Sequence, residues 1–398
     1  MKVLDVTEFF SEHGGVRAYL ELKGQALRKR GHRQLVIAPG RSQDSRQAEV
    51  EFIESPALPY DPTYFLLARI DRVAARVLDE RPDVLELHSA YMAMAAAFYT
   101  PRRAYGLRTL FWHADFVDTY LKHRLDRWLP SVAGRLATRS LWAGVRALAA
   151  RCDATLVAGR HQFEKLRSHG VPRLYLLPFG VNKEIFHPAA AFQARDSDRA
   201  AHGRRLRVVA AGRFAVEKRF DVVVEAFRRI AERRPATLLL YGEGPEQSDL
   251  ERRARGVDVR FLGFERNRAA LAAGFAGADL LLHGCPHETF GLVVAEARAC
   301  GLPVVVPDAG GAGEGADPAC SERYRAGDPE ACAAAAERLL QRDPAELRRR
   351  AIESAARITS VDEHFDALLA LYRELLDARA ARSQAPLSPP VAAEPVPE

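Results

Sequence analysis

Two carboxylates, Glu288 and Glu296, lie eight positions apart in the apolar segment HETFGLVVAEARACGLPVVVP (287–307). We expect a helix from about Gly291 to Cys300, ended by Gly301. Eight helical residues span about 12 Å, which is the length scale of a sugar–diphosphate–ribose unit. One carboxylate would then accept hydrogen bonds from sugar hydroxyls and the other from ribose hydroxyls.

The start of the same helix is suited to an anion. The backbone amides of Phe290, Gly291 and Leu292 lie in its first turn, where no intrahelical acceptor reaches them. Phosphate oxygens between the two carboxylates would accept from these amides. For Glu296 the alternative is an ion pair with an arginine, since a carboxylate among apolar residues is costly to leave unpaired.

Two cations follow the strand RVVAAG in the second half of the chain. Arg213 comes directly after the strand and Lys218 opens the next helix. Together they can hold a diphosphate and stabilise it as a leaving group, with their charge in the place of a metal ion. The alternative is a solvated basic turn in an arginine-rich protein.

Glycines follow the first strand in the same way. Gly14 and Gly15 precede a helix, so the backbone there can approach an anionic ligand. A plain tight turn explains the pair equally well. A G-x-G-x-x-G fingerprint is absent from this loop, which counts against a nicotinamide dinucleotide.

Other post-strand residues extend the same pattern. Gly242 and Gly244 follow a strand and suit either a backbone wall of the site or a bare turn. His113 ends the buried strand TLFWH, where it would contact a sugar, orient one, or act as a polar cap.

A metal site is not expected. Asp196 and Asp198 form a D-x-D, but they lie in a polar linker and follow no strand. His283 and His287 flank a Gly-Cys-Pro loop and do not share a helix face, as a metal-binding pair four positions apart would require.

Short β-branched runs alternate with helical stretches along the chain, which predicts parallel sheets covered on both faces. The expected strands are 2–6, 33–38, 50–53, 83–88, 109–113, 154–159, 174–180, 206–212, 236–242, 259–263, 278–284 and 303–307, with helices at 16–30, 64–79 and 132–150. The polar stretch after position 188 separates two such series. We therefore expect two doubly wound Rossmann-like domains, whose ligand sits in the interdomain cleft at the carboxyl ends of the strands.

The composition of the chain indicates its compartment and its possible partners. The chain has 398 residues and a net charge of +6, and its five cysteines contain no C-x-x-C pair. An odd cysteine count, no signal-peptide h-region and no apolar run near 20 residues predict a cytoplasmic protein. The segment 122–151, with seven Lys/Arg and one acid, suits either an ordinary helical face or peripheral contact with anionic lipid on the inner face of the membrane. We expect no nucleic-acid partner.

These motifs together resemble the retaining GT-B glycosyltransferases of group 1, family 4. The resemblance covers roughly residues 1–380 and rests on five stretches. They are Gly14-Gly15, AGRFAVEK (211–218), GEGPE (242–246), ETFGLVVAEARACGLPVVVPDAGGAGE (288–314) and VDEHFDALLALYRELL (361–376). Within the family, HGGVRAYLELKGQALRKRGH and HETFGLVV look most like GDP-mannose-dependent α-mannosyltransferases.

The resemblance implies a fold and a division of labour between domains. Residues 1–188 would form the acceptor-side domain and 189–360 the nucleotide-sugar-binding domain. A last helix, within 361–380, would cross back onto the first domain. Residues 381–398 form a Pro-rich tail that we expect to be disordered.

The resemblance also implies roles for individual residues. Glu296 would bind the ribose, and Glu288 with the amides at 290–292 would hold the donor sugar and diphosphate. Arg213 and Lys218 would neutralise the diphosphate.

Three more roles follow from the same family pattern. Gly15 would approach the phosphates from the other domain, and His113 would lie beside the donor sugar. The backbone around Gly263 would meet the nucleobase.

The expected activity is transfer of a hexose, with mannose favoured, from a nucleotide-diphosphate sugar to a lipid or glycan acceptor with retention at the anomeric carbon. GDP-mannose is favoured over UDP-sugars as the donor, with no other cofactor and no metal. Two alternatives share the architecture: a sugar-nucleotide epimerase, and a non-catalytic subunit that binds nucleotide sugars. Turnover of a sugar nucleotide alone, or binding without turnover, would distinguish them.

Overall fold

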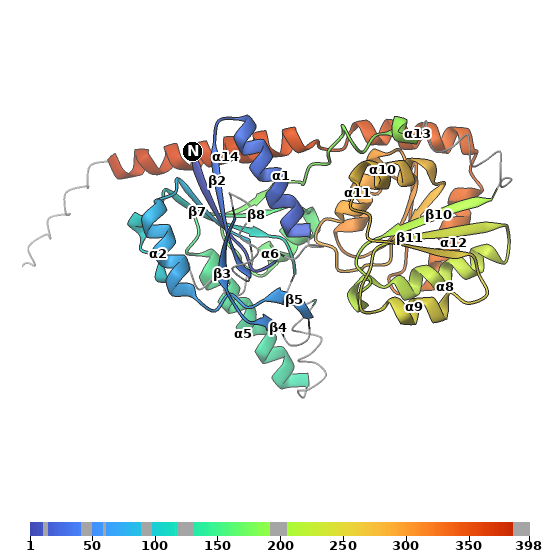
Figure 1. Cartoon of the computed structure of the whole chain (residues 1–398), viewed down its shortest axis with the longest axis horizontal. Coiled ribbons are helices and arrows are strands. Elements are labelled where there is room, and N and C mark those ends of the chain that lie inside the picture. Colours follow the sequence, from blue (N-terminus) through green and yellow to red (C-terminus); the bar gives the residue numbers. More distant parts are fainter. Residues whose placement is uncertain are drawn as a thin grey trace, which may run out of the picture.

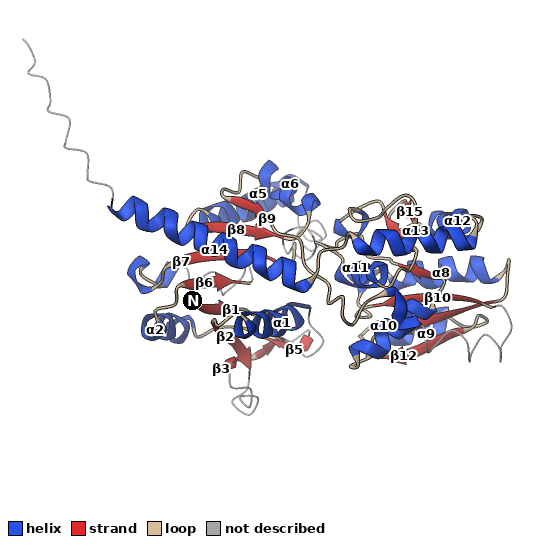
Figure 2. Cartoon of the chain, turned by 90° about the horizontal axis from the view of Figure 1, so that it is seen from above, coloured by secondary structure: helices blue, strands red, loops and turns tan. Residues whose placement is uncertain are grey.

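Two parallel sheets lie side by side, each with helices packed on both of its faces (Figure 1, Figure 2). The computed structural model describes residues 1–10, 15–40, 50–58, 61–88, 98–115, 117, 119, 131–191 and 205–384. Gly14, the D-x-D at 196–198 and part of the basic segment 122–151 fall outside these ranges.

The first sheet is formed by the N-terminal half of the chain. Its strands are β1 (Lys2–Val6), β2 (Arg33–Gly40), β3 (Val50–Glu54), β6 (Val84–Leu87), β7 (Leu107–Trp112), β8 (Ala154–Val157) and β9 (Leu174–Leu176). They are all parallel, in the order β3-β2-β1-β6-β7-β8-β9. Every residue of β6, β7 and β8 is buried, as expected for central strands covered on two faces. A short antiparallel pair, β4 (Ala57–Leu58) and β5 (Asp61–Phe65), lies outside this sheet.

Five of the helices that the structure describes cover the first sheet. They are α1 (Gly15–Lys29), α2 (Ile70–Glu80), α5 (Ser131–Ala149), α6 (Arg160–Ser168) and α14 (Val361–Gln384). One hydrophobic core joins the sheet to apolar residues of α2, α5 and α6. A second core, on the other face, joins it to α1 and to the C-terminal helix α14.

The second sheet repeats this plan. Its strands are β10 (Leu206–Ala211), β11 (Ala236–Tyr241), β12 (Val259–Gly263), β13 (Leu280–Leu282), β14 (Val304–Pro307) and β15 (Ser321–Tyr324), in the parallel order β12-β11-β10-β13-β14-β15. Its helices are α8 (Phe220–Ala231), α9 (Gln247–Arg253), α10 (Arg268–Gly277), α11 (Leu292–Ala299), α12 (Pro329–Leu340) and α13 (Pro344–Ala356). Residues of α8 and α12 line one core and residues of α10 and α11 line the other.

The strand order reverses once in each sheet, next to β1 in the first and next to β10 in the second. Ligands of doubly wound sheets bind at the carboxyl ends of the strands at such a point. The loops that follow β10 and β13, which contain Arg213, Lys218 and Glu288, lie at this end of the second sheet. The expectation of two doubly wound sheets is confirmed.

Helix α14 connects the two halves. Val181 and Ser360 form an isolated parallel bridge where the chain returns from the second half, and α14 then runs along the first half (Figure 2). Arg30, directly after α1, donates to Asp366 of α14 at 2.7 Å. Among the described residues, no helix combines the length and apolarity needed to cross a membrane.

Three sequence predictions need correction. The helix expected at 64–79 begins only at Ile70, and residues 61–65 form a strand. The strand β15 was not predicted. The last helix continues to Gln384, so residues 381–384 are helical and do not belong to the predicted disordered tail. Residues 385–398 lie outside the described residues. The domain boundaries at 188 and 360 stay predictions.

Candidate functional site

Lys218 and Glu288 lie in direct contact. The Lys218 Nζ is 2.7 Å from Glu288 Oε1, and the two side chains are 30% and 18% exposed. Burial alone would raise the pKa of Glu288, but the charge of Lys218, His283 and hydrogen bonds outweigh it and hold this pKa below its usual range. The structure therefore places an ion pair, still accessible to solvent, at the carboxyl end of the second sheet.

Neutral groups flank the acid of this pair. His283 Nε2 is 3.6 Å from Glu288 Oε1, and burial lowers the pKa of His283 to about 4. Burial likewise raises the pKa of the Cys285 thiol to about 12. At neutral pH both side chains are uncharged, so Lys218 supplies the positive charge beside Glu288.

Helix α11 begins one residue later than predicted. Gly291 is its N-cap, with a left-handed φ of +83°, and a Cβ there would come within 3.0 Å of Ala312. Phe290 precedes this turn and Leu292 is the first helical residue. The predicted separation of about 12 Å between the two glutamates does not apply, because residues 288–291 are not helical.

A cavity of about 120 Å³ lies beside the end of strand β10. It is lined by Ala211, Gly212, Arg213, Tyr241, Gly242, Glu243, Phe264, Glu265, Arg268, Leu271 and Val293. Gly242 cannot carry a side chain, because its φ is +142° and a Cβ would overlap the carbonyl oxygen of Gly212. Arg213 thus borders a hollow with apolar walls and charged edges, which has the character of a small-molecule pocket.

The predicted nucleobase loop borders this cavity. Gly263 adopts a left-handed φ of +71°, and its carbonyl accepts from the amide of Gly242 at 2.8 Å. The next amide, of Phe264, donates to Glu243 Oε1 at 3.2 Å. The backbone around Gly263 is therefore held next to the cavity by two hydrogen bonds.

Glu296 is buried on α11 and paired with Arg268, which opens α10 and lines the same cavity. An arginine partner was the alternative considered for Glu296. Burial raises the pKa of this carboxyl to about 7, more than Arg268 lowers it. The carboxyl is thus only partly ionised at neutral pH, and a ribose hydroxyl would have to share it with Arg268.

The raised pKa of Glu296 predicts that the stability of the folded chain depends on pH. Between its ordinary pKa of 4.5 and about 7, the folded chain holds a proton that the unfolded chain has lost, so the wild type loses stability as pH rises. Glu296→Gln mimics the protonated acid and does not lose this stability. Its stability relative to wild type should therefore increase as pH rises from 4.5 to 8. The gain should reach on the order of 2 kcal/mol, measured as thermal midpoints across pH.

A control variant is available on the surface. Arg349 and Arg350 hold the pKa of Glu346 at about 2, so Glu346 stays ionised throughout this pH range. Glu346→Gln should shift the midpoint by the same amount at every pH from 5 to 8. A midpoint difference for Glu296→Gln that does not change with pH would contradict the raised pKa.

His113 lies where the two halves meet. Its backbone carbonyl accepts from Thr289 Oγ1 at 2.7 Å, and its ring packs 5.5 Å from that of Phe179, which contacts the ring of Phe290. The Tyr19 ring is 5.1 Å from His113. Tyr19 follows Gly15 by about one turn of α1. Gly15 therefore lies on the same face of α1 as Tyr19, whose ring contacts His113.

Further contacts join the halves near His113. The carboxylate of Glu314, in the second half, accepts from the amides of Arg160 and His161 at the N-terminus of α6. Gly159 approaches the carbonyl oxygen of Thr289 so closely that a Cβ would overlap it. Beside these contacts lies a cavity of about 250 Å³ with walls from both halves.

Comparison with known proteins identifies the family. Residues 13–185 match the family described as Glycosyltransferase Family 4 and residues 205–342 match Glycosyl transferases group 1. A GDP-mannose-dependent alpha-(1-6)-phosphatidylinositol dimannoside mannosyltransferase of Mycobacterium tuberculosis is 30% identical over 318 residues, covering 77% of this chain and 79% of the relative. The chain belongs to the group 1, family 4 glycosyltransferases.

Other similarities agree with this assignment. A GDP-mannose-dependent alpha-mannosyltransferase of Mycolicibacterium smegmatis is 29% identical over 295 residues, which cover 72% of this chain and 73% of the relative. The solved sucrose-phosphate synthase of Thermosynechococcus elongatus superposes with a TM-score of 0.75 at 19% identity, over 95% of this chain and all of that one. The glycosyltransferase therefore has the GT-B fold that its sequence predicted.

Two groups of side chains in the described part of the glycosyltransferase have the spacing of metal ligands: His283, Cys285 and Glu288, and Asp5, Glu86 and His88. In both groups the carboxylates already face an ammonium. Lys218 pairs with Glu288, and Lys23 lies between the two acids of the other group. A fixed lysine charge therefore already lies against the carboxylates of each group.

Sequence reasoning missed several groups that border the site. Arg268, Glu243, Thr289 and Phe179 were not singled out, although each contacts a predicted site residue. For Arg268 a signal existed: the glycosyltransferase carries it at the start of a helix directly after the predicted nucleobase loop.

Proposed function

We propose that this glycosyltransferase moves a hexose, with mannose favoured, from a nucleotide-diphosphate sugar to a lipid or glycan acceptor with retention of anomeric configuration. The observation that carries the proposal is the Lys218–Glu288 pair, held 2.7 Å apart at the end of the second sheet. Its ammonium can stabilise the charge that grows on a leaving diphosphate. The carboxylate beside it can accept hydrogen bonds from sugar hydroxyls.

GDP-mannose is the donor that the relatives favour. Both relatives described above are named for dependence on this nucleotide sugar. In the proposed pose the nucleoside lies in the cavity between Arg213 and Phe264, with Glu296 and Arg268 reaching its ribose. The diphosphate lies between Arg213 and Lys218, and the sugar reaches Glu288 and His113.

The proposed chemistry uses the chain's own charge and amides. As the bond from the anomeric carbon to the phosphate oxygen breaks, positive charge develops on the sugar ring and negative charge on the diphosphate. Lys218, Arg213 and the first amides of α11 stabilise the diphosphate. The acceptor hydroxyl attacks from the face that the diphosphate leaves, and its proton passes to the departing phosphate oxygen. We expect transfer to persist in EDTA, and NMR of the product to show the donor's anomeric configuration.

The acceptor is proposed to be a lipid-linked or glycan hydroxyl bound by the N-terminal half. The Mycobacterium tuberculosis relative is named for a phosphatidylinositol dimannoside. On α5, Val132 and Leu136 are 67% and 66% exposed beside the exposed Arg135 and Arg139. This surface suits peripheral contact with an anionic membrane, which flotation with phosphatidylglycerol vesicles would test.

A thermal-shift panel tests the donor. A ligand that binds only the folded state stabilises it by about 2.7 kcal/mol at 100 times its dissociation constant. GDP-mannose should raise the thermal midpoint more than GDP-glucose, UDP-glucose or UDP-galactose at equal concentration. A larger shift with a uridine nucleotide would overturn the proposed base. Incubation of the preferred donor without acceptor should give no epimer, since an epimer would favour the alternative reaction.

A further inference from the structure

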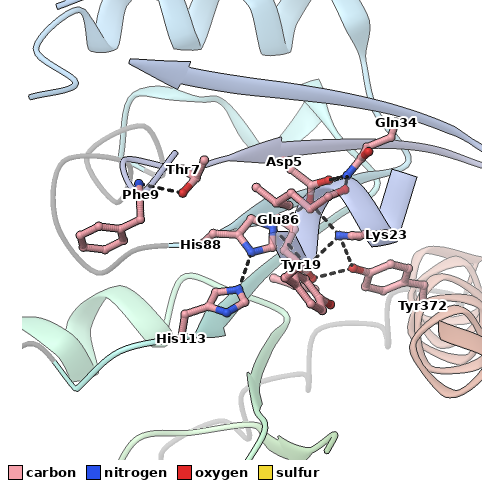
Figure 3. A network of polar contacts seen from close by, with 12 residues as sticks. Asp5, Thr7, Phe9, Tyr19, Lys23, Gln34, Glu86, His88, His113 and Tyr372 are labelled. Atoms are coloured by element: carbon pink, nitrogen blue, oxygen red, sulfur yellow. Dashed lines mark hydrogen bonds and ion pairs between the residues drawn. The ribbon is translucent and has the colours of Figure 1, made fainter. Parts of the chain in front are cut away.

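A network of buried charges lies in the N-terminal half, close to His113 (Figure 3). Lys23 of α1 has no exposed side-chain area, and its Nζ lies 2.7 Å from Asp5 Oδ1 and 2.8 Å from Glu86 Oε1. Both acids are fully buried as well, on the adjacent strands β1 and β6. Removing three charges from water costs several kcal/mol per ion, so a buried cluster of this kind is weak evidence for a role in stability.

The network is closed by a residue from the far end of the chain. Tyr372 of α14 donates to Glu86 Oε2 at 2.6 Å and accepts from Lys23 Nζ at 3.2 Å. Gln34 and Thr109 donate to the two acids, Gln34 to Asp5 and Thr109 to Glu86. The acids therefore have partners on several elements, so their positions are fixed by the fold.

His88 connects this network to His113. Its Nε2 is 2.8 Å from Asp5 Oδ1 and its Nδ1 is 2.8 Å from His113 Nε2. His88 is fully buried directly after β6, while the ring of His113 follows β7 at the junction of the halves. Figure 3 shows the His88 ring between Asp5 and His113.

The charge on Asp5 sets the direction of these hydrogen bonds. Burial would raise the pKa of Asp5, but Lys23 and His88 reverse this and lower it far below its usual range. An ionised carboxylate only accepts, so His88 Nε2 carries the proton. When the His88 ring carries only this one proton, its Nδ1 accepts and His113 Nε2–H is the donor.

The same reasoning defines the outer nitrogen of His113. Burial, together with the charge of Lys23, lowers the pKa of His113 well below its usual value, so its ring is neutral. A neutral imidazole has one N–H, and here it is used on His88. The Nδ1 of His113 is left as a hydrogen-bond acceptor.

We propose that His88 is a positioning residue for sugar transfer, which fixes the tautomer and ring plane of His113 so that His113 Nδ1 accepts from a hydroxyl of the bound sugar. Lys23 and Asp5 hold His88 in this state. The inference rests on the proposed place of His113 beside the donor sugar.

Packing of aromatic rings alone would not fix the tautomer of His113. Phe111 and Phe179 stack on His113 with ring centroids 4.6 and 5.5 Å away and interplanar angles of 19° and 13°. These apolar contacts hold the ring in place, but they are nearly the same for both tautomers. The hydrogen bond from His88 is the contact that distinguishes one nitrogen from the other.

Two variants separate the two hydrogen bonds of His88. The amide of Asn hangs from Cγ, as Nδ1 does, so His88→Asn keeps an acceptor for His113 and loses the bond to Asp5. The amide of Gln hangs from Cδ, as Nε2 does, so His88→Gln keeps the bond to Asp5 and loses the one to His113. We expect H88Q to lower kcat at least about tenfold with donor KM within about twofold, and H88N to stay within about threefold of wild type.

Double variants separate this inference from the proposed function. If His113→Ala is fully active, the proposed place of His113 fails and the inference with it. If H113A is impaired, H88Q should add little further loss in that background, because coupled residues are not additive. An impaired H113A together with a fully active H88Q, or equal kcat losses in H88Q and H88N, would overturn the role of His88 alone.

Imidazole ¹⁵N NMR reads the tautomer directly and needs no active variant. In histidine-labelled wild type, we expect His113 to be protonated at Nε2 and unprotonated at Nδ1, with its signals assigned through H113A. In H88Q the two tautomers should mix. A proton on His113 Nδ1 in the wild type would make His88 a donor to His113 and would overturn the proposal.

Discussion

Replacement of Lys218 by methionine should lower kcat for sugar transfer by about 10²–10³-fold. Methionine keeps much of the apolar stem but removes the ammonium that lies 2.7 Å from Glu288. In the proposed pose, the negative charge on the leaving diphosphate would then lose one of the two side-chain cations that stabilise it. The loss should appear in steady-state kinetics with a nucleotide sugar and a saturating acceptor.

Lys29→Met is the matched control. Lys29 is also ion-paired, 3.4 Å from Asp362, but its side chain is 69% exposed on α1. Exposed pairs contribute little, so this variant should transfer sugar at close to the wild-type rate. A K218M enzyme within threefold of wild type would remove Lys218 from the transition state and require a different source of charge.

The stability of K218M must be checked separately, because Glu288, whose side chain is only 18% exposed, would be left without its cation. Burial is the largest influence on the pKa of Glu288 and raises it, so this pKa should rise once Lys218 is gone. The double variant Lys218→Met, Glu288→Gln has no such uncompensated charge. If both variants keep the wild-type thermal midpoint and both are slow, the defect belongs to catalysis and not to folding.

The strand–helix alternation was sufficient to predict both sheets, because central strands of parallel sheets are continuous apolar runs bounded by turns. The failures occurred where this signal is weak. The run YFLLARI is apolar except for Arg69 and suits a strand or a helix. In the structure its first two residues end β5 and its last residue begins α2. The edge strand β15, SERY, buries only its two end residues and therefore reads as polar loop.

The candidate site was predictable where one segment contains it. Glu288, the turn at Gly291 and Glu296 lie within nine consecutive positions, so their types and spacing are visible in the sequence. Arg268 is 28 positions from its partner Glu296, and no periodicity connects the two. Only the packing of α10 against α11 brings them together.

The burial of Lys23 was even harder to predict from the sequence. In the sequence it is one of several lysines and arginines on an amphipathic helix, where a solvated side chain is the ordinary expectation. Its burial depends on Asp5 and Glu86, which are 18 and 63 positions away. A buried lysine cannot be distinguished from a surface lysine until the strands that carry its partners are placed.

Gly159→Ala should reduce kcat/KM for transfer by about 10²-fold without unfolding either half. The backbone of Gly159 is extended, with φ of −116°, so alanine fits its conformation and the only conflict is with its neighbour. That neighbour is the carbonyl oxygen of Thr289, which a Cβ would overlap. To relieve the overlap, Thr289 must move, and with it the hydrogen bond to His113 and the adjacent Glu288.

Gly144→Ala is the control, because a Cβ at Gly144 meets nothing within 4 Å. Gly144 lies inside α5, where alanine is favoured over glycine by roughly 1 kcal/mol, so this variant should be fully active and slightly more stable. Full activity in G159A would mean that the contact between Gly159 and Thr289 opens during turnover. A large loss in G159A with an unchanged midpoint would instead show that transfer needs the halves as close as they are here, since the hydroxyl-binding side chains of the proposed site come from both.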